Sequence, residues 1–247
     1  MSLQTWTNVR LFAGSADLTG YSNKVEVSAE VDPQDATTFG SGGWEESIGG
    51  LRSTEINAEG LWDAGTTELP DDAGFGQLGI AYPVSVCPNT PADGDLAYFT
   101  SGVRLDYTMG GQVGDIAPWT SSFKGTWPLV RGVSAHPPGT ARTATGVGTG
   151  LNLGAVPTGS TLYANLHVLA ASGTTPTLDV IVRSSPDNTF ASPTTVVTFP
   201  QFTTTTGSSS MSLAGPITNS WFKVNWTITG TSPSYRFIVT LGIAAAS

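Results

Sequence analysis

Alternation of side chains with a period of two residues is the feature that most constrains the fold of this chain. In residues 24–31 apolar side chains alternate with polar or charged ones, and residues 55–62 repeat the pattern. Successive side chains of a strand point to opposite faces, so this alternation indicates antiparallel strands with one solvated face. Glycine-rich connectors separate the runs, and no segment has the periodicity of a long helix. Residues 69–79, with Pro70 near their start, are expected to hold at most a short helix.

The second half of the chain contains further runs rich in β-branched and aromatic residues, which are typical of strands. These runs cover residues 161–169, 177–183, 194–199, 221–229 and 235–243. Before them, proline, glycine and threonine crowd together without periodicity, as in a linker. We therefore expect an all-β protein with a first domain in residues 1–140, a linker in residues 141–152 and a β-sandwich of jelly-roll or immunoglobulin type in residues 153–247.

Charge is distributed unevenly between the two halves. Residues 1–145 hold 17 of the 19 acidic and 7 of the 10 basic side chains, a local net charge of −10, whereas residues 146–247 have a net charge of +1. Charged residues make up only 12% of the chain, about half of the usual share. Because the cores of protein interfaces are depleted in charge, this composition favours a subunit whose surface is largely covered by neighbours.

Several classes of protein are excluded by composition. The single cysteine, Cys87, cannot form an intrachain disulfide, and its apolar neighbours indicate a small buried hydrophobe. No apolar run reaches the length of a membrane span, and the first residues do not resemble a signal peptide. The basic residues are too scattered to form a nucleic-acid-binding stripe. We expect a chain that is made in a cytoplasm and does not insert into membranes.

The residue types that usually carry catalysis or bind metals are few and lie far apart. His136 precedes two prolines, and His167 shares a strand face with Tyr163 and Asn165, which we expect to look outward. Neither histidine belongs to a catalytic motif, so we expect structural roles for both. The acids near residues 93–95 lack the ligand spacing of a calcium loop. We predict no catalytic residue, no metal site and no cofactor, and therefore a protein that is not an enzyme.

Four glutamates are the exception, because they are spaced four apart in the two alternating strands. Residues of one strand separated by an even number lie on one face, so the two strands would form an acidic wall if they pair. The four residues are Glu26, Glu30, Glu55 and Glu59. Such a wall is either an ordinary solvated face, a pair of carboxylates for glycoside hydrolysis, or a lining that repels the phosphates of passing DNA.

A series of short motifs follows in a fixed order along the first half. The strand of residues 23–31 is followed by an acid-x-Thr-Thr-Phe-Gly loop in residues 35–44, and a Gly-Leu turn in residues 48–63 leads to a strand ending in Gly-x-Trp-Asp. Further segments of this series are residues 94–99, 111–117 and 129–132. Over residues 10–135 this order resembles the major tail proteins, or tail tube proteins, of long-tailed bacteriophages.

The resemblance implies both a fold and an assembly. Tail tube subunits are β-sandwich or barrel domains with a short helix, and they form hexameric rings that stack into a conduit for double-stranded DNA, which passes without specific binding. On this chain, the resemblance implies that the four glutamates line the channel and that residues 32–51 form a loop between rings. The inter-ring candidates are Asp35, Phe39, Trp44 and Leu51. Its partners would be copies of itself and other tail proteins, and its location the virion tail, assembled in the host cytoplasm.

The second half is similar to the sandwich modules that such tail proteins carry outside the tube. A module of this kind could contact glycans of the host surface, and Trp221 is the candidate, because Trp226 shares a strand face with apolar residues and is expected in the core. The alternative from another class is a lectin-like carbohydrate-binding protein, with Trp221, Trp226 and Tyr235 as a stacking platform. A glycoside hydrolase is the third hypothesis.

Overall fold

The computed structural model describes residues 6–65 and 69–245 and confirms that the chain is all-β, with only short helices. Its named strands pair in one connected antiparallel sheet with the central order β13-β12-β15-β9-β6-β5-β1-β2. Strands β3, β4, β7 and β8 branch from this order at β6, through β8. None of the helices in the described ranges is long and apolar enough to cross a membrane.

The elements of the first half are short apart from one hairpin. The strands are β1 (Arg10–Ala13), β2 (Ala16–Asp17), β3 (Ser22–Asp35), β4 (Ser47–Leu61), β5 (Ala81–Cys87), β6 (Leu96–Arg104), β7 (Thr108–Met109), β8 (Pro118–Gly125) and β9 (Val130–His136). The helical turns are η1 (Leu18–Tyr21), η2 (Phe39–Ser41) and α1 (Pro70–Phe75). The expected short helix is therefore confirmed as α1, which begins at Pro70 and has two acidic residues in its first turn.

Two very long strands dominate the second half. The strands are β10 (Gly146–Val147), β11 (Leu151–Asn152), β12 (Ser160–Ser185), β13 (Thr194–Thr198), β14 (Gly207–Ala214) and β15 (Trp221–Ala245). β12 and β15 pair along almost their whole length. The expected strands at residues 161–169 and 177–183 are the two halves of β12, and those at residues 221–229 and 235–243 are the two halves of β15. The register shifts near Gly173, which has a φ of 125°, and Gly230 has a φ of 113°. At these positions the paired strands bend, and both halves of β12 contribute to one apolar core.

The first half of β12 is buried on both faces. Its even-numbered residues, such as Leu162 and Leu166, belong to the core of the C-terminal half. Its odd-numbered residues pack on the N-terminal half, where Leu169 joins Phe12 and Cys87 in a smaller apolar cluster. The expectation that Tyr163, Asn165 and His167 look outward is therefore wrong: none is more than 3% exposed, because the N-terminal half covers that face.

Strand β9 connects the two halves. It pairs with β6 on one side and with β15 on the other, so a single sheet continues from residues of the first half into those of the second. β10 and β11, which lie in or next to the expected linker at residues 141–152, also pair with β15. The division of the chain into two domains stays a prediction.

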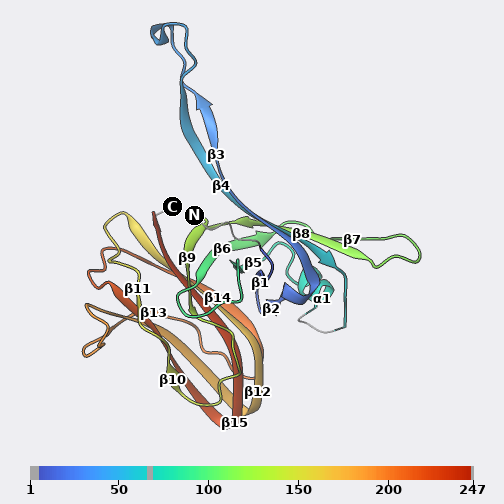
Figure 1. Cartoon of the computed structure of the whole chain (residues 1–247), viewed down its shortest axis with the longest axis vertical. Helices are drawn as coiled ribbons and strands as arrows, with labels where there is room; N and C mark the ends of the chain where they lie inside the picture. The colour runs from blue at the N-terminus through green and yellow to red at the C-terminus, as the bar shows by residue number, and fades with distance from the viewer. Residues whose placement is uncertain (1–5, 66–68, 246–247) are drawn as a thin grey trace.

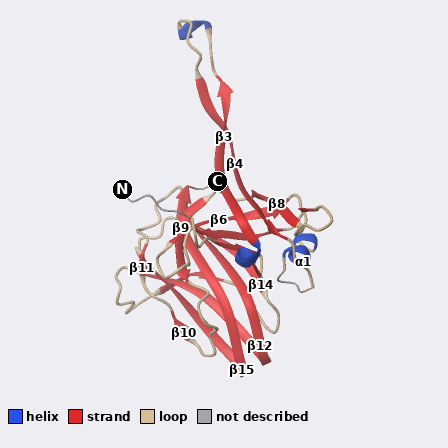
Figure 2. Ribbon diagram, turned by 45° about the vertical axis from the view of Figure 1, so that its right-hand side comes forward, coloured by secondary structure: helices blue, strands red, loops and turns tan. Residues whose placement is uncertain are grey.

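The β3–β4 hairpin extends far beyond the rest of the molecule (Figures 1 and 2). Among the described strands β3 pairs with β4 alone, and β4 pairs with β8 only over residues 55–61. Beyond residue 30 the side chains of the hairpin are almost all exposed. The segment expected as an inter-ring loop is therefore strand for part of its length, since β3 continues to Asp35 and β4 begins at Ser47.

Candidate functional site

The β3–β4–β8 sheet has one apolar and one polar face at the base of the hairpin. Ile56 and Ala58 are buried in the N-terminal core together with Phe123, and Val25 and Val27 pack against that core. On the other face the register sets Glu26 opposite Asn57 and Ser28 opposite Glu55, and it sets Lys24 opposite Glu59 and Glu30 opposite Ser53. The structure therefore brings the four predicted glutamates to one face, which we call the polar face.

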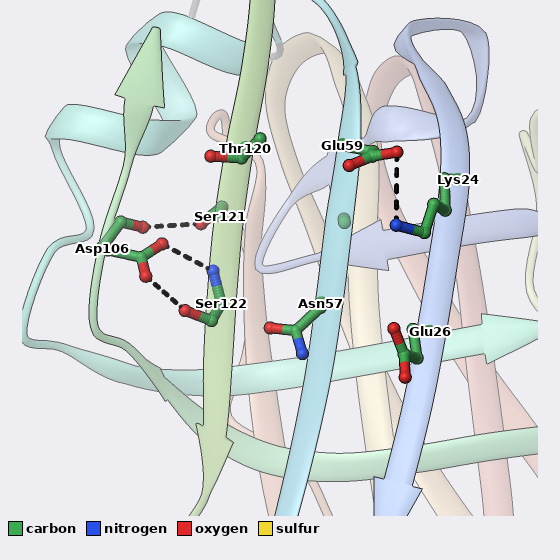
Figure 3. A pocket seen from close by; sticks show the side chains of 9 residues that line it. Lys24, Glu26, Asn57, Glu59, Asp106, Thr120, Ser121 and Ser122 are labelled. Atoms are coloured by element: carbon green, nitrogen blue, oxygen red, sulfur yellow. Dashed lines mark hydrogen bonds and ion pairs between the residues drawn. The ribbon is translucent and has the colours of Figure 1, made fainter.

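Two lysines offset part of the acidic charge of the polar face. Lys24 Nζ lies 3.4 Å from Glu59 Oε1, and Lys124 on β8 is opposite Glu55. Figure 3 shows Lys24 reaching along the sheet toward Glu59, with Glu26 one step further along β3. The four glutamates still outnumber the two lysines, so the face has a negative net charge.

Asp106 adds a carboxylate at the edge of the polar face, where sequence reasoning did not place one. It accepts a hydrogen bond from the Ser122 backbone N–H at 2.8 Å and another from the Ser122 hydroxyl (Figure 3). The cavity over these residues has a volume of about 240 Å³, below the range of about 300–1,000 Å³ that is usual for small-molecule sites. The polar face thus carries a charged cavity that is smaller than a usual small-molecule site.

The tip of the hairpin, residues 36–46, is ordered by its own hydrogen bonds. Asp35 accepts from the Thr37 backbone N–H at 2.8 Å, and the Thr37 bonds hold the pKa of that carboxyl below its usual value. The Thr37 hydroxyl accepts from the Glu46 N–H at 2.9 Å across the loop. Thr38 and Ser41 form a capping box at the N-terminus of η2. The tip is therefore a defined surface.

This ordered tip presents large apolar side chains to solvent. Phe39 is fully exposed and Trp44 is 80% exposed, and on the adjoining strands Val31, Ile48 and Leu51 are exposed as well. Three of the predicted inter-ring residues, Asp35, Phe39 and Trp44, lie at or beside the tip, and Leu51 lies further down β4. Contiguous exposed apolar residues of this kind mark surfaces that bind another molecule.

A second exposed apolar group was not predicted from the sequence. Met109 is exposed at the end of β7, and Val113 and Ile116 are exposed in the connection between β7 and β8. Met109 and Val113 line a cavity of about 440 Å³ together with Trp62. The sequence carries only a weak signal here, because Gly110, Gly111 and Gly114 interrupt any apolar periodicity.

The aromatic residues of the C-terminal half do not form an exposed platform. Trp226 and Tyr235 are buried, as Trp226 was predicted to be, while Trp221 is half-buried at the start of β15. Trp226 packs against His136 and Phe237, with ring centroids 4.7 and 5.8 Å away. The assignment of Trp221 as a glycan contact stays a prediction.

The histidines and the cysteine lie in the interior. Burial lowers the pKa of His136 and of His167 to about 4, so both are neutral near pH 7. His167 Nε2 lies 2.8 Å from Ser85 Oγ, and Nδ1 lies 2.7 Å from the carbonyl oxygen of Gly14. Burial raises the pKa of Cys87 to about 12, which fits its predicted role as a small buried hydrophobe. No group of three metal-ligating side chains occurs in the described part of the chain.

Comparison with solved structures finds chains that match this one at low sequence identity and with TM-scores below 0.5. The virion of a native gene transfer agent particle contains a chain with 18% identity and a TM-score of 0.41, over 52% of this chain and 98% of that one. A chain from the tail of the empty particle, which has C6 symmetry, has 17% identity and a TM-score of 0.40, and the match covers the same shares of the two chains. The SPP1 Dit protein, a phage hub protein, has 15% identity and a TM-score of 0.36, and the match covers 96% of this chain and 99% of that protein.

Sequence comparison adds no assignment. No protein-family model matches the chain, and no curated protein does.

Proposed function

We propose that this protein is a structural subunit of a bacteriophage tail, of the tail tube type, that assembles with copies of itself. In this proposal, six copies form a ring, rings stack into a tube, and the tube serves as a conduit for genome delivery. The protein acts as a building block of the virion tail, with other tail proteins as neighbours, and not as an enzyme.

The observation that carries this proposal is the projecting hairpin with its ordered apolar tip. Side chains such as Phe39 and Trp44 gain nothing from exposure in a solitary chain, since burying a large apolar side chain contributes about 1.5–3 kcal/mol. A flexible loop could hide such residues against its own body, but this hairpin holds them away from it (Figure 1). A neighbouring subunit is the partner that could best bury these side chains.

The polar face supports the second part of the proposal. In a ring, copies of this face placed side by side would make a wall rich in carboxylates, with Glu26 and Glu59 repeated in each subunit. Phosphates are repelled by such a wall, so double-stranded DNA would slide past it without being held. The outer edge of β3, which pairs only with β4, is a joint for a neighbouring strand.

Electron microscopy of the purified protein tests the proposal directly. We expect hollow tubes or six-fold rings whose abundance rises with protein concentration, together with a fast-sedimenting species in analytical ultracentrifugation. A protein that remains monomeric at the highest attainable concentration, in the absence and presence of tail partners, would overturn it.

The carbohydrate-binding alternative has less support. Its stacking platform required Trp221, Trp226 and Tyr235 on an accessible surface, and the last two are buried. A host-glycan contact through Trp221 would be an additional property of the outer half of the proposed subunit, to be measured by glycan binding of the full chain and of Trp221→Ala.

A further inference from the structure

The charge of the hairpin restricts what its tip can contact. Residues 32–51 contain four acidic side chains and neither lysine nor arginine. Glu45 and Glu46 lie next to Trp44, so the apolar surface and the negative charge are presented together. A surface that receives the tip must therefore offer both positive charge and an apolar or aromatic contact.

The apolar cavity beside the β7–β8 connection has the wrong charge for this role. Asp115 lines it, and the Trp62 indole N–H on its wall donates to Asp71 at 3.1 Å. Like charges brought together across an interface cost several kcal/mol, so an acidic tip would be repelled there.

A different groove has the required chemistry. Two adjoining cavities of about 590 and 340 Å³ share Arg10 and Thr19 in their walls. Lys24 lines the first and Arg236 the second, so three basic side chains surround one groove. Trp6, which is 49% exposed, lies at its edge and offers an aromatic surface. We call this the basic groove.

The basic groove keeps an excess of positive charge within the chain. Lys24 has Glu59 as a partner at 3.4 Å, and Arg236 has Asp17 at 3.9 Å. Arg10 has no ion pair among the described residues, although it is half-buried at the start of β1. A partly desolvated guanidinium without a carboxylate is a favourable receptor for one from another molecule.

The basic groove and the acidic tip lie at opposite ends of the β3–β4 hairpin. β3 begins at the groove, where Ser22 to Val25 line its wall, and ends at the tip (Figure 1). The eleven residue-to-residue steps from Lys24 to Asp35 span about 36 Å at the rise of a strand. Two such ends on one molecule favour a head-to-tail contact, which repeats without limit when it is made by translation.

We infer that the basic groove of one copy receives the acidic, aromatic tip of the β3–β4 hairpin of the next copy along the tube. In this contact Glu45 and Glu46 pair with Arg10 and its basic neighbours, while Trp44 packs beside Trp6. The inference rests on the proposed function and specifies the receptor surface for stacking. The inference also predicts a spacing of about 36 Å between stacked copies, which is the length of β3 between the basic groove and the tip.

Charge reversal on each side, separately and together, tests the contact. Arg10→Glu and the double variant E45K/E46K should each raise the protein concentration needed for tube formation by about tenfold or more. The triple variant that carries all three changes should recover assembly, because the charges are exchanged and not removed. Arg10→Lys should retain most of it.

Matched controls separate this contact from a general effect of charge. Arg131→Glu changes an exposed arginine outside the groove, and Asp115→Lys changes an exposed acid outside the tip, so both should assemble as the unchanged protein does. Melting temperatures of all variants should agree within a few degrees, which establishes that the reversed side chains do not unfold the chain.

The outcomes distinguish the contact from the function. If the unchanged protein forms tubes and Arg10→Glu forms them equally well, the basic groove is not the receptor and the proposed function stands. If each reversal prevents assembly and the triple variant does not recover it, the two surfaces do not meet. If the unchanged protein never assembles, the proposed function fails and the stacking contact fails with it.

Discussion

At the residue scale, the most consequential side chain is His167. It lies at the junction of the two halves of the chain and is fully buried. Its ring contacts Ser85 and the carbonyl of Gly14, and Ser85 lies 3.3 Å from Thr240, so four segments of the chain meet in one polar network. Because a buried polar group without a partner is costly, this network ties the N-terminal half to β12 and β15 in one arrangement.

The protonation of His167 predicts a pH dependence of stability. Its pKa is about 4 in the folded protein and about 6.5 when unfolded, so the unfolded chain takes up a proton first as the pH falls. The free energy of unfolding should therefore decrease between pH 6.5 and 4, with a contribution from His167 on the order of 3 kcal/mol. His136 contributes in the same direction.

Urea denaturation at pH 7.0 and at pH 5.0 measures this effect. The variant His167→Gln keeps a polar side chain but cannot titrate, so it should be less stable at pH 7 and should lose less stability between the two pH values. His136→Gln is the matched variant for the other histidine. A pH dependence that is identical in all three proteins would contradict the assignment.

Arg104 predicts an unusual response to an apolar substitution. Its guanidinium is buried, with Nε donating to the Tyr82 hydroxyl at 2.6 Å and the Phe123 ring 4.8 Å away, but Nη1 and Nη2 have no hydrogen-bond partner among residues 6–65 and 69–245. Replacing a poorly compensated buried charge by an apolar side chain of similar length is often neutral or stabilising. Arg104→Met should therefore change the free energy of unfolding by less than ~1 kcal/mol or raise it.

Arg104→Ala is the control for this prediction, because it removes the packing of the side chain as well as its charge. It should destabilise the protein by ~2–4 kcal/mol in the same denaturation experiment. If Arg104→Met is as harmful as Arg104→Ala, the guanidinium has partners that stabilise it and the prediction is wrong.

At the element scale, the base and the outer part of the β3–β4 hairpin have different surroundings. Its base belongs to the N-terminal core through Ile56 and Ala58, whereas its outer part packs on nothing else in the described chain. The alternation in residues 24–31 and 55–62 was sufficient to predict these strands and, at the base of the hairpin, which residues face the core, because the buried face of a strand carries its apolar side chains. The alternation did not predict how far the strands continue. Neither face of the outer part is buried, so its apolar and polar residues need not alternate.

Replacing the tip by a tight turn tests this difference. A variant in which residues 36–46 are replaced by Asn-Gly should fold with an unchanged melting temperature, because the removed residues make no contact with the core. The same variant should form no tubes. Calorimetry and electron microscopy measure the two properties, and a melting temperature lowered by more than about 5 °C would show that the tip supports the fold.

At the scale of the whole molecule, the acidic charge of the polar face acquires a role in the proposed tube. Within one chain Glu26 is exposed, while Glu59 is half-buried and pairs with Lys24. In a tube, the same face would repeat around a channel and its field would add up.

Reversing charge on this face should convert the channel from repelling to retaining DNA. Tubes of the unchanged protein should not bind double-stranded DNA, whereas tubes of Glu26→Lys/Glu59→Lys should bind it with an affinity that falls steeply as salt is added. Asp187→Lys, an exposed acid of the C-terminal half, is the matched control and should leave DNA unbound. Equal retention by both variants would place the polar face outside the channel.

The sequence by itself determined the strand content, the short helix at Pro70 and the grouping of four glutamates on one face. These are local properties, because the period of two in a strand assigns each side chain to a face without reference to distant residues. The burial of Cys87 and of Trp226 followed in the same way from their apolar neighbours.

Only the tertiary structure decided how the two halves of the chain meet. The second face of β12 is buried because residues of the N-terminal half cover it, and polar residues such as Asn165 and His167 find partners there, with Asn165 donating to the Thr100 carbonyl at 2.9 Å. The basic groove is likewise assembled from Arg10, Lys24 and Arg236, which no local pattern connects. Contacts between distant segments depend on the packing of the whole sheet, and a local pattern of side chains does not record them.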